Sequence, residues 1–208
     1  MSGSHEYLSA GVYQITVTVV YKDQITGDVE FTQVGVPGFV VIYDPKAKGG
    51  FVTGGGWFDS PPSAYMLYDT SVSHVTGKAH FGFVSKYKKG QSIPDGSTNF
   101  RFEAGDLDFD ATAYDWMIIS GARVRYKGEG TVNGGAELYK FRVTAHDASD
   151  SGDDIAEDGF RIKIWREDSG GAEIILYDNG LGVDDSTGGG GTTPLGGGSI
   201  TVHESKKK

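Results

Sequence analysis

Hydrophobic and polar residues alternate along the N-terminal part of the chain with the period of two that is typical of β-strands. Between residues 12 and 20, apolar side chains occupy every second position and alternate with glutamine and threonine. Residues 29–34 alternate in the same way after a polar turn, so the two segments predict a half-buried β-hairpin. A third apolar strand is expected at residues 38–43.

The remainder of the chain continues as short apolar segments. Strands are expected at residues 75–85, 99–109, 116–120, 122–128, 129–132, 138–145, 159–165, 174–177 and 199–203. Turn signals such as Asn133-Gly134 recur at intervals of about eight to twelve residues, which is typical of β-sandwiches. No segment has the apolar periodicity of a helix. We therefore expect an all-β fold, an antiparallel two-sheet sandwich that is jelly-roll-like.

The polar segment at residues 44–48 is the expected boundary between two parts of the chain. Residues 1–44 then form an N-terminal β-hairpin segment, residues 45–204 the main sandwich domain, and residues 205–208 a tail.

A glycine-rich aromatic run, GGFVTGGGWFDSP, follows this boundary at residues 49–61. Five glycines exclude a helix, because each costs about 1 kcal/mol in a helix interior relative to alanine. We interpret the run as the first strand of the main domain, with Phe51 and Trp57 anchored in the core. Its glycines serve either close packing, which we favour, or the approach of a ligand to the backbone.

Several segments resemble a family of bacterial and archaeal surface proteins, the post-COAP domain. They are GFVTGGGW at residues 50–57, GKAHFGFVSKYKKG at 77–90, FEAGDL at 102–107, YDW at 114–116, YKGEGT at 126–131, FRIKIW at 160–165, YDN at 177–179 and LGGGSI at 195–200. The resemblance extends from residue 41 to residue 203. It implies a secreted or cell-surface protein, and it implies no defined activity.

The first forty residues are instead similar to the closing strands of a polycystic-kidney-disease-type (PKD-type, Ig-like) domain. This resemblance rests on the segment AGVYQITVTV at residues 10–19. The first half of such a domain is absent, so these strands either pack on the main domain or pair with a second chain through an open edge.

Charge and composition narrow the classes of partner. The formal net charge of the 208 residues is −9, and dense basic sequence occurs only at residues 86–89 and 206–208, so we expect no nucleic-acid binding. No cysteine is present, which excludes disulfides and thiolate metal sites. No apolar window has the length of a membrane helix, so we expect no membrane insertion.

Acidic loops are the strongest candidates for chemistry. Residues 147–158 carry six carboxylates, which repel one another unless a cation offsets their charge. Calcium takes six to eight oxygen ligands from such loops. We predict a structural calcium site with the ligands Asp147, Asp158, Asp178 and Asn179. The alternative is a solvated acidic hairpin tip, and the spacing does not match an EF-hand.

Two other groups of residues are candidates for binding or catalysis. Asp106, Asp108 and Asp110 alternate on one expected strand, either as a carboxylate ladder for acid–base chemistry or, as we favour, as its solvent face. Trp57, Tyr65 and Tyr68 are candidate sugar-stacking aromatics around an irregular segment.

The sequence therefore favours a non-catalytic extracellular module with a binding or assembly role, whose partner is a glycan or another surface protein. The alternatives are a carbohydrate-binding module that uses exposed aromatics, a glycoside-active enzyme, and self-association through the N-terminal strands.

Overall fold

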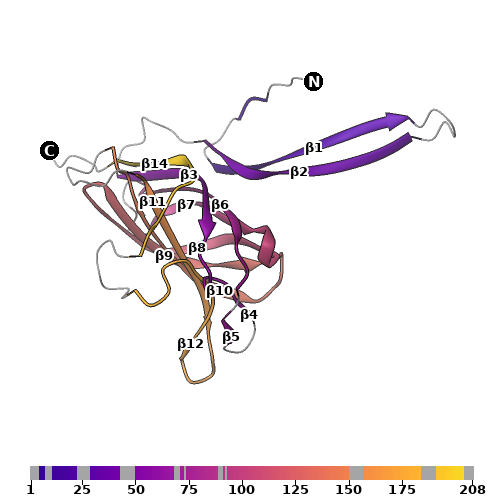
Figure 1. Ribbon diagram of the computed structural model, residues 1–208. Helices are drawn as coiled ribbons and strands as arrows, with labels where there is room; N and C mark the ends of the chain where they lie inside the picture. The colour runs from indigo at the N-terminus through magenta and orange to yellow at the C-terminus, as the bar shows by residue number, and fades with distance from the viewer. Residues whose placement is uncertain are drawn as a thin grey trace.

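The structure is a computed structural model that describes residues 5–7, 11–22, 29–42, 50–67, 71–72, 74–88, 91, 93–149, 157–183 and 191–203. Within these residues the chain is built from antiparallel strands and one short 3-10 turn, η1 (Glu103–Gly105) (Figure 1). The strands are β1 (Gly11–Lys22), β2 (Val29–Ile42), β3 (Phe51–Ser60), β4 (Met66–Leu67), β5 (Ser71–Val72), β6 (Gly77–Lys86), β7 (Asp95–Phe102), β8 (Leu107–Ser120), β9 (Arg123–Val132), β10 (Leu138–His146), β11 (Gly159–Glu167), β12 (Glu173–Asp178), β13 (Thr193–Pro194) and β14 (Gly197–His203). No helix of the described part is long and apolar enough to cross a membrane.

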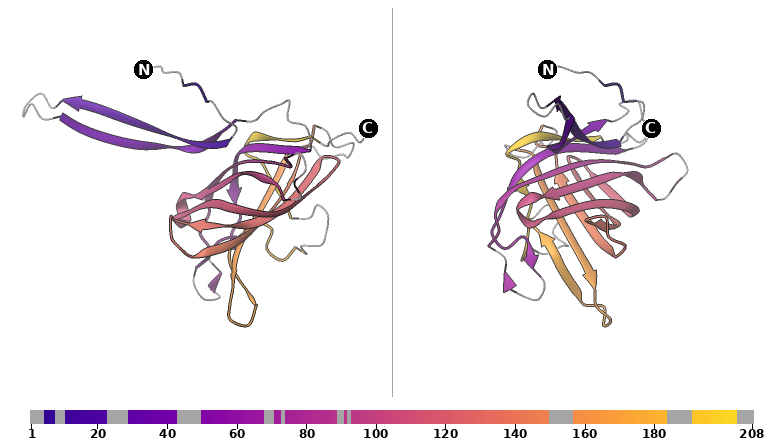
Figure 2. Two further views of the ribbon diagram at one scale, coloured as in Figure 1. Left: turned by 180° about the vertical axis from the view of Figure 1, so that it is seen from behind. Right: turned by 90° about the vertical axis from the view of Figure 1, so that its right-hand side faces the viewer.

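The main sheet is one continuous hydrogen-bonded path, β12-β11-β10-β9-β8-β7-β6-β3-β14, to which β13 adds beside β11. This sheet curls into a half-barrel (Figures 1 and 2). The all-β antiparallel prediction is therefore confirmed. The two-sheet, jelly-roll-like sandwich is not confirmed, since the long described strands of the main domain follow each other around a single curl and β4 and β5 form only a separate two-stranded pair.

Aromatic rings join the opposite walls of the half-barrel. Phe81 of β6 and Phe160 of β11 stack with centroids 3.9 Å apart, although five strand-to-strand steps separate β6 from β11 in the sheet. On β7, Phe100 contacts Tyr177 of β12 at 4.7 Å. All four rings are fully buried. The curl thus buries the apolar side chains of the inner strand faces in a single aromatic core.

The glycine-rich run forms β3, as expected, and its glycines permit close packing. A Cβ at Gly54 would lie 2.6 Å from the ring of Phe83 and 2.9 Å from Ile200. The prediction that Trp57 anchors the core is wrong: Trp57 is half-buried, and its neighbour Phe58 is fully buried. The alternation of the strand explains this, because adjacent residues face opposite sides of a sheet.

The hairpin β1–β2 forms its own two-stranded sheet and extends away from the half-barrel (Figure 1). The expected strand at residues 38–43 is continuous with β2, and β2 contacts β3 and β6. The expected half-buried face is wrong for the middle of β1, where Ile15 and Val17 are 39% and 46% exposed. The predicted domain boundary at residues 44–48 lies outside the described residues.

The segment at residues 99–109 is not one strand, contrary to expectation. Strand β7 ends at Phe102, and Asp106 adopts a left-handed conformation with φ of 48° before β8 begins. Close packing accompanies the break, because a Cβ at Gly105 would lie 2.8 Å from the ring of Phe102. Ala104 is exposed in the turn, although it lies two positions after the buried Phe102.

Candidate functional site

The predicted calcium ligands lie around the C-terminal segment, residues 191–203. Asp147 and Asp158 bind backbone N–H groups of β14, and Asn179 binds Thr193 of β13. Asp178 precedes Asn179 and binds Arg161 of β11. The sequence therefore identified four residues that belong to one end of the fold. In the structure, a side-chain oxygen of each of them accepts a hydrogen bond from an N–H group.

Asp147 and Asp158 hold the outer edge of β14. The Asp158 carboxylate accepts the N–H of Ile200 at 2.7 Å and, with its other oxygen, the N–H of Ala148 at 2.8 Å. Asp147 accepts the N–H of Val202 at 3.1 Å and that of Ser149 at 3.0 Å. Among the described strands β14 pairs only with β3, so the carboxylates act in place of a ladder partner on its other edge. They join β14 to the residues that follow β10 and precede β11.

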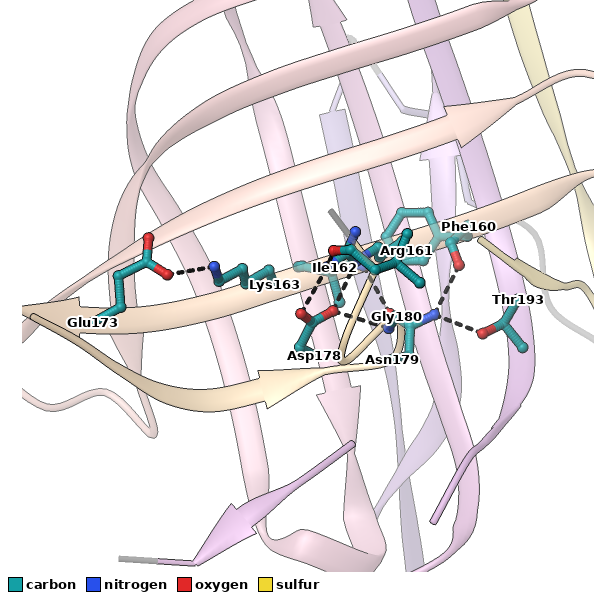
Figure 3. A network of polar contacts seen from close by, with 10 residues as sticks. Phe160, Arg161, Ile162, Lys163, Glu173, Asp178, Asn179, Gly180 and Thr193 are labelled. Carbon is teal, nitrogen blue, oxygen red and sulfur yellow. Dashed lines mark hydrogen bonds and ion pairs between the residues drawn. The ribbon is translucent and has the colours of Figure 1, made fainter. Parts of the chain in front are cut away.

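The second cluster is a buried ion pair with an asparagine beside it (Figure 3). Arg161 donates twice to Asp178, with both N–O distances 2.8 Å, and the pair is almost fully buried. Asp178 also accepts the N–H of Gly180 at 2.9 Å. A Cβ at Gly180 would lie 2.4 Å from the Arg161 side chain, so this turn fits closely over the guanidinium.

Asn179 takes the place of a strand partner where β12 ends. Its side-chain oxygen accepts the N–H of Ile162 at 2.8 Å. Its amide nitrogen donates to the carbonyl oxygen of Phe160 and to the Thr193 hydroxyl, each at 2.8 Å (Figure 3). The side chain thus satisfies backbone groups of β11 and connects them to β13.

These contacts give the four residues a structural role. Carboxylates that accept backbone N–H groups stabilise loops without a cation. Within the described ranges, no group of three or more His, Asp or Glu side chains is placed to hold a metal ion. Residues 150–156, which carry the middle of the acidic loop, lie outside these ranges. The calcium site stays a prediction.

The candidate sugar-stacking aromatics belong to β3 and the segment after it, and they adjoin this end of the fold: Gly196 donates its N–H to the carbonyl oxygen of Trp57, and Tyr65 forms a β-bridge with Tyr177. The Trp57 ring contacts Gly196 and Gly197 on the β14 side, and the Lys78 ammonium group lies 2.8 Å from its centroid. Tyr65 is half-buried against Phe102, with ring centroids 6.0 Å apart. Tyr68 lies outside the described residues.

The expected carboxylate ladder consists of two aspartates with cross-strand partners. Arg101 binds Asp108 at 2.5 Å, and Asn99 binds Asp110. Asp106 lies in the turn before β8 and not on the strand face. Burial, followed by the nearby charge of Asp108, raises the pKa of Asp110 above its usual value. The favoured interpretation, an amphipathic strand with a polar outer face, agrees with this pairing.

The sequence predictions missed a group of basic residues on the outer face of β9, β10 and β11. The cations recur at every second position: Arg123, Arg125 and Lys127 on β9, Lys140 and Arg142 on β10, and Arg161 and Lys163 on β11. Five of the six arginines of the chain lie in these strands, namely Arg123, Arg125, Arg142, Arg161 and Arg166. The recurrence of a cation at every second position in three expected strands is the sequence signal that could have identified this group.

Comparison with family models, with curated proteins and with solved structures finds no match to this chain.

Proposed function

We propose that this chain is a non-catalytic module of a secreted or cell-surface protein, with a binding or assembly role. The resemblance to the post-COAP family supports the location. The observation that carries the assembly role is the hairpin β1–β2, which extends from the half-barrel as a separate two-stranded sheet (Figure 1).

The hairpin has the properties of an arm that pairs with another chain. Isolated two-stranded hairpins are marginally stable in water, and an open strand edge pairs readily with another strand. Ile15 and Val17 expose apolar side chains in the middle of β1. A third strand would bond to the edge and place its own side chains beside these on the faces of the sheet. We infer that the partner is a second copy of this chain.

We predict that Ile15→Lys combined with Val17→Lys weakens self-association by about tenfold or more, because it removes apolar burial and adds charge repulsion. Sedimentation over a range of protein concentrations measures the association. Thr16→Lys combined with Thr18→Lys is the matched control, since both threonines are exposed and the added charge is the same. A wild-type chain that stays monomeric at all concentrations contradicts the proposed association.

The calcium site is tested separately. If residues 147–158 bind calcium together with Asp178 and Asn179, titration of the chelator-treated protein releases heat and raises the melting temperature. Asp154→Asn removes one carboxylate of the loop and leaves the carboxylates of Asp147 and Asp158 unchanged, so it should weaken binding without removing the contacts of those two residues. Absence of both heat and a thermal shift rules the calcium site out.

A further inference from the structure

The main sheet ends at β12 in an edge that is only partly paired. β12 is the last strand of the hydrogen-bonded path, with β11 on one side of it. On its other side, the described residues pair with it only near its end, through a Tyr65–Tyr177 bridge and a bond from the N–H of Asp178. β4 contacts β12 but pairs with β5. Along residues 173–176 this edge therefore has no strand paired to it within the described chain.

The opposite edge of the main sheet is protected and the β12 edge is less so. On β14, the carboxylates of Asp147 and Asp158 accept two N–H groups of the edge strand. Native proteins protect edges with such cover, or with charges, prolines and bulges. Apart from a bulge at Leu176, residues 174–176 of β12 have no such device: they carry no charge and no proline, and Ile174 is 39% exposed. β12 is thus the edge of the main sheet to which a further strand can add.

The hairpin offers its own regular edge on β1. Opposite Ile15, β2 accommodates three residues, 36–38, before the regular pairing resumes at Thr16. One of the three is Pro37, which has no N–H group to donate to a neighbouring strand. β1 has no proline, and its residues 11–21 carry no charge. β1 is therefore the strand of the hairpin that is suited to pair with another sheet.

The hairpin and the β12 edge lie at opposite ends of the molecule. Figures 1 and 2 show the hairpin beside β3 and β14 at one end of the half-barrel, and the turn that joins β11 to β12 at the other end. The hairpin is anchored at its end, where β2 contacts β3 and β6 and β1 contacts β6 and β7. Because β1 points away from its own β12, the two edges meet only between different copies of the chain.

We propose that β1 of one copy adds as a strand to the β12 edge of the next copy, so that self-association is head-to-tail. This inference rests on the proposed assembly role and names the surface that receives the hairpin. In the added strand, the exposed Ile15 and Val17 lie beside Ile174, at the spacing of about 5 Å at which cross-strand apolar side chains interact. Residues 11–21 and 174–177 are uncharged, so no like charges meet in the pairing of molecules whose formal net charge is −9.

A contact of this kind uses two different surfaces of each copy. It is heterologous, so it extends as an open chain of copies unless the rotation between neighbours closes a ring. Two hairpins that paired with each other would instead use the same surface twice and would not require β12. The two arrangements therefore differ in the effect of a substitution on the β12 edge.

The edge variant is Ile174→Asp, and its matched control is Ile118→Asp. Both isoleucines are exposed, by 39% and 51%, and each lies directly opposite an arginine of the neighbouring strand, Arg166 and Arg125. An aspartate opposite an arginine is favourable in a sheet, so both variants should fold, which circular dichroism verifies. In sedimentation, self-association should weaken by about tenfold or more in Ile174→Asp and stay unchanged in Ile118→Asp.

Mixing two variants tests the direction of the contact. Ile15→Lys combined with Val17→Lys leaves the β12 edge intact, and Ile174→Asp leaves the hairpin intact. At a concentration at which the wild type associates, each variant alone should sediment as a monomer. Their equimolar mixture should form a heterodimer, because the hairpin of the edge variant can pair with the β12 edge of the hairpin variant.

The outcomes separate this proposal from the assembly role. Self-association of Ile174→Asp at the wild-type level overturns the β12 edge as the receiving surface, and the hairpin then retains its assembly role with another surface. Equal weakening in Ile118→Asp, or a mixture that stays monomeric, also overturns the head-to-tail contact. A wild-type chain that stays monomeric at all concentrations contradicts the assembly role itself.

Discussion

Asp178→Ala should destabilise the protein by about 3–5 kcal/mol, because it leaves the Arg161 guanidinium buried without its carboxylate. Both side chains are almost completely excluded from solvent, and the pair is bidentate. The same substitution removes the acceptor for the N–H of Gly180, so the turn after β12 loses a contact as well. Denaturant unfolding followed by tryptophan fluorescence measures the change in the free energy of unfolding.

Two further variants test whether the expected cost comes from burial of the ion pair or from the loss of any ion pair. Glu167→Ala breaks the ion pair of Glu167 with Lys140 and should cost less than about 1 kcal/mol, because the Lys140 and Glu167 side chains are 39% and 41% exposed. The double variant Arg161→Met and Asp178→Leu removes both charges and should be markedly more stable than Asp178→Ala alone. Equal destabilisation by Asp178→Ala and Glu167→Ala would refute the role assigned to burial.

Asp158→Ala should release β14 from the residues that precede β11 and cost about 1–3 kcal/mol. The N–H of the buried Ile200 loses its acceptor, and the half-buried Ala148 loses one hydrogen bond; an unsatisfied buried donor costs about 1–3 kcal/mol. Hydrogen exchange should then accelerate at the Ile200 amide by more than the global loss of stability explains. The Val202 amide, which donates its hydrogen bond to Asp147, should be affected less.

Asp168→Ala is the matched control for this prediction. Asp168 also accepts two backbone N–H groups, those of Gly170 and Ala172, but it does so in the exposed turn between β11 and β12. Water can replace its carboxylate there, so we expect a loss below about 1 kcal/mol. Unchanged exchange at Ile200 in Asp158→Ala would show that the carboxylate does not hold β14.

The elements that could be predicted from sequence are those fixed by local pattern. Strands β6, β10, β11 and β14 were expected within a few residues of their observed bounds, because alternation and turn residues act over short distances. The break at residues 103–106 was missed, although the apolar positions change from even numbers (Phe100, Phe102) to odd numbers (Leu107, Phe109) across it. The packing of Gly105 against Phe102 is a contact that no periodicity encodes.

The predicted calcium ligands also show what local sequence can and cannot determine. Asp147, Asp158, Asp178 and Asn179 were singled out because their side chains carry oxygen ligands, and the same oxygens accept backbone N–H groups. Sequence cannot distinguish these two roles, because the donors come from Ile200, Val202 and Ile162, most of them far away along the chain. The group of basic residues on β9, β10 and β11 was missed for a related reason: its cations are dispersed over three strands.

The sequence by itself determined that the chain is all-β, that its strands are antiparallel and joined by tight turns, and that its glycine-rich run is a closely packed strand. These properties follow from side-chain periodicity and turn chemistry, which are local. The tertiary structure alone decided that the main strands form one curled sheet, that two carboxylates hold β14, and that Arg142 lies between Lys127 and Lys163. Each of these depends on the order and register in which distant strands pair, and on the aromatic core, in which Phe81 of β6 stacks on Phe160 of β11.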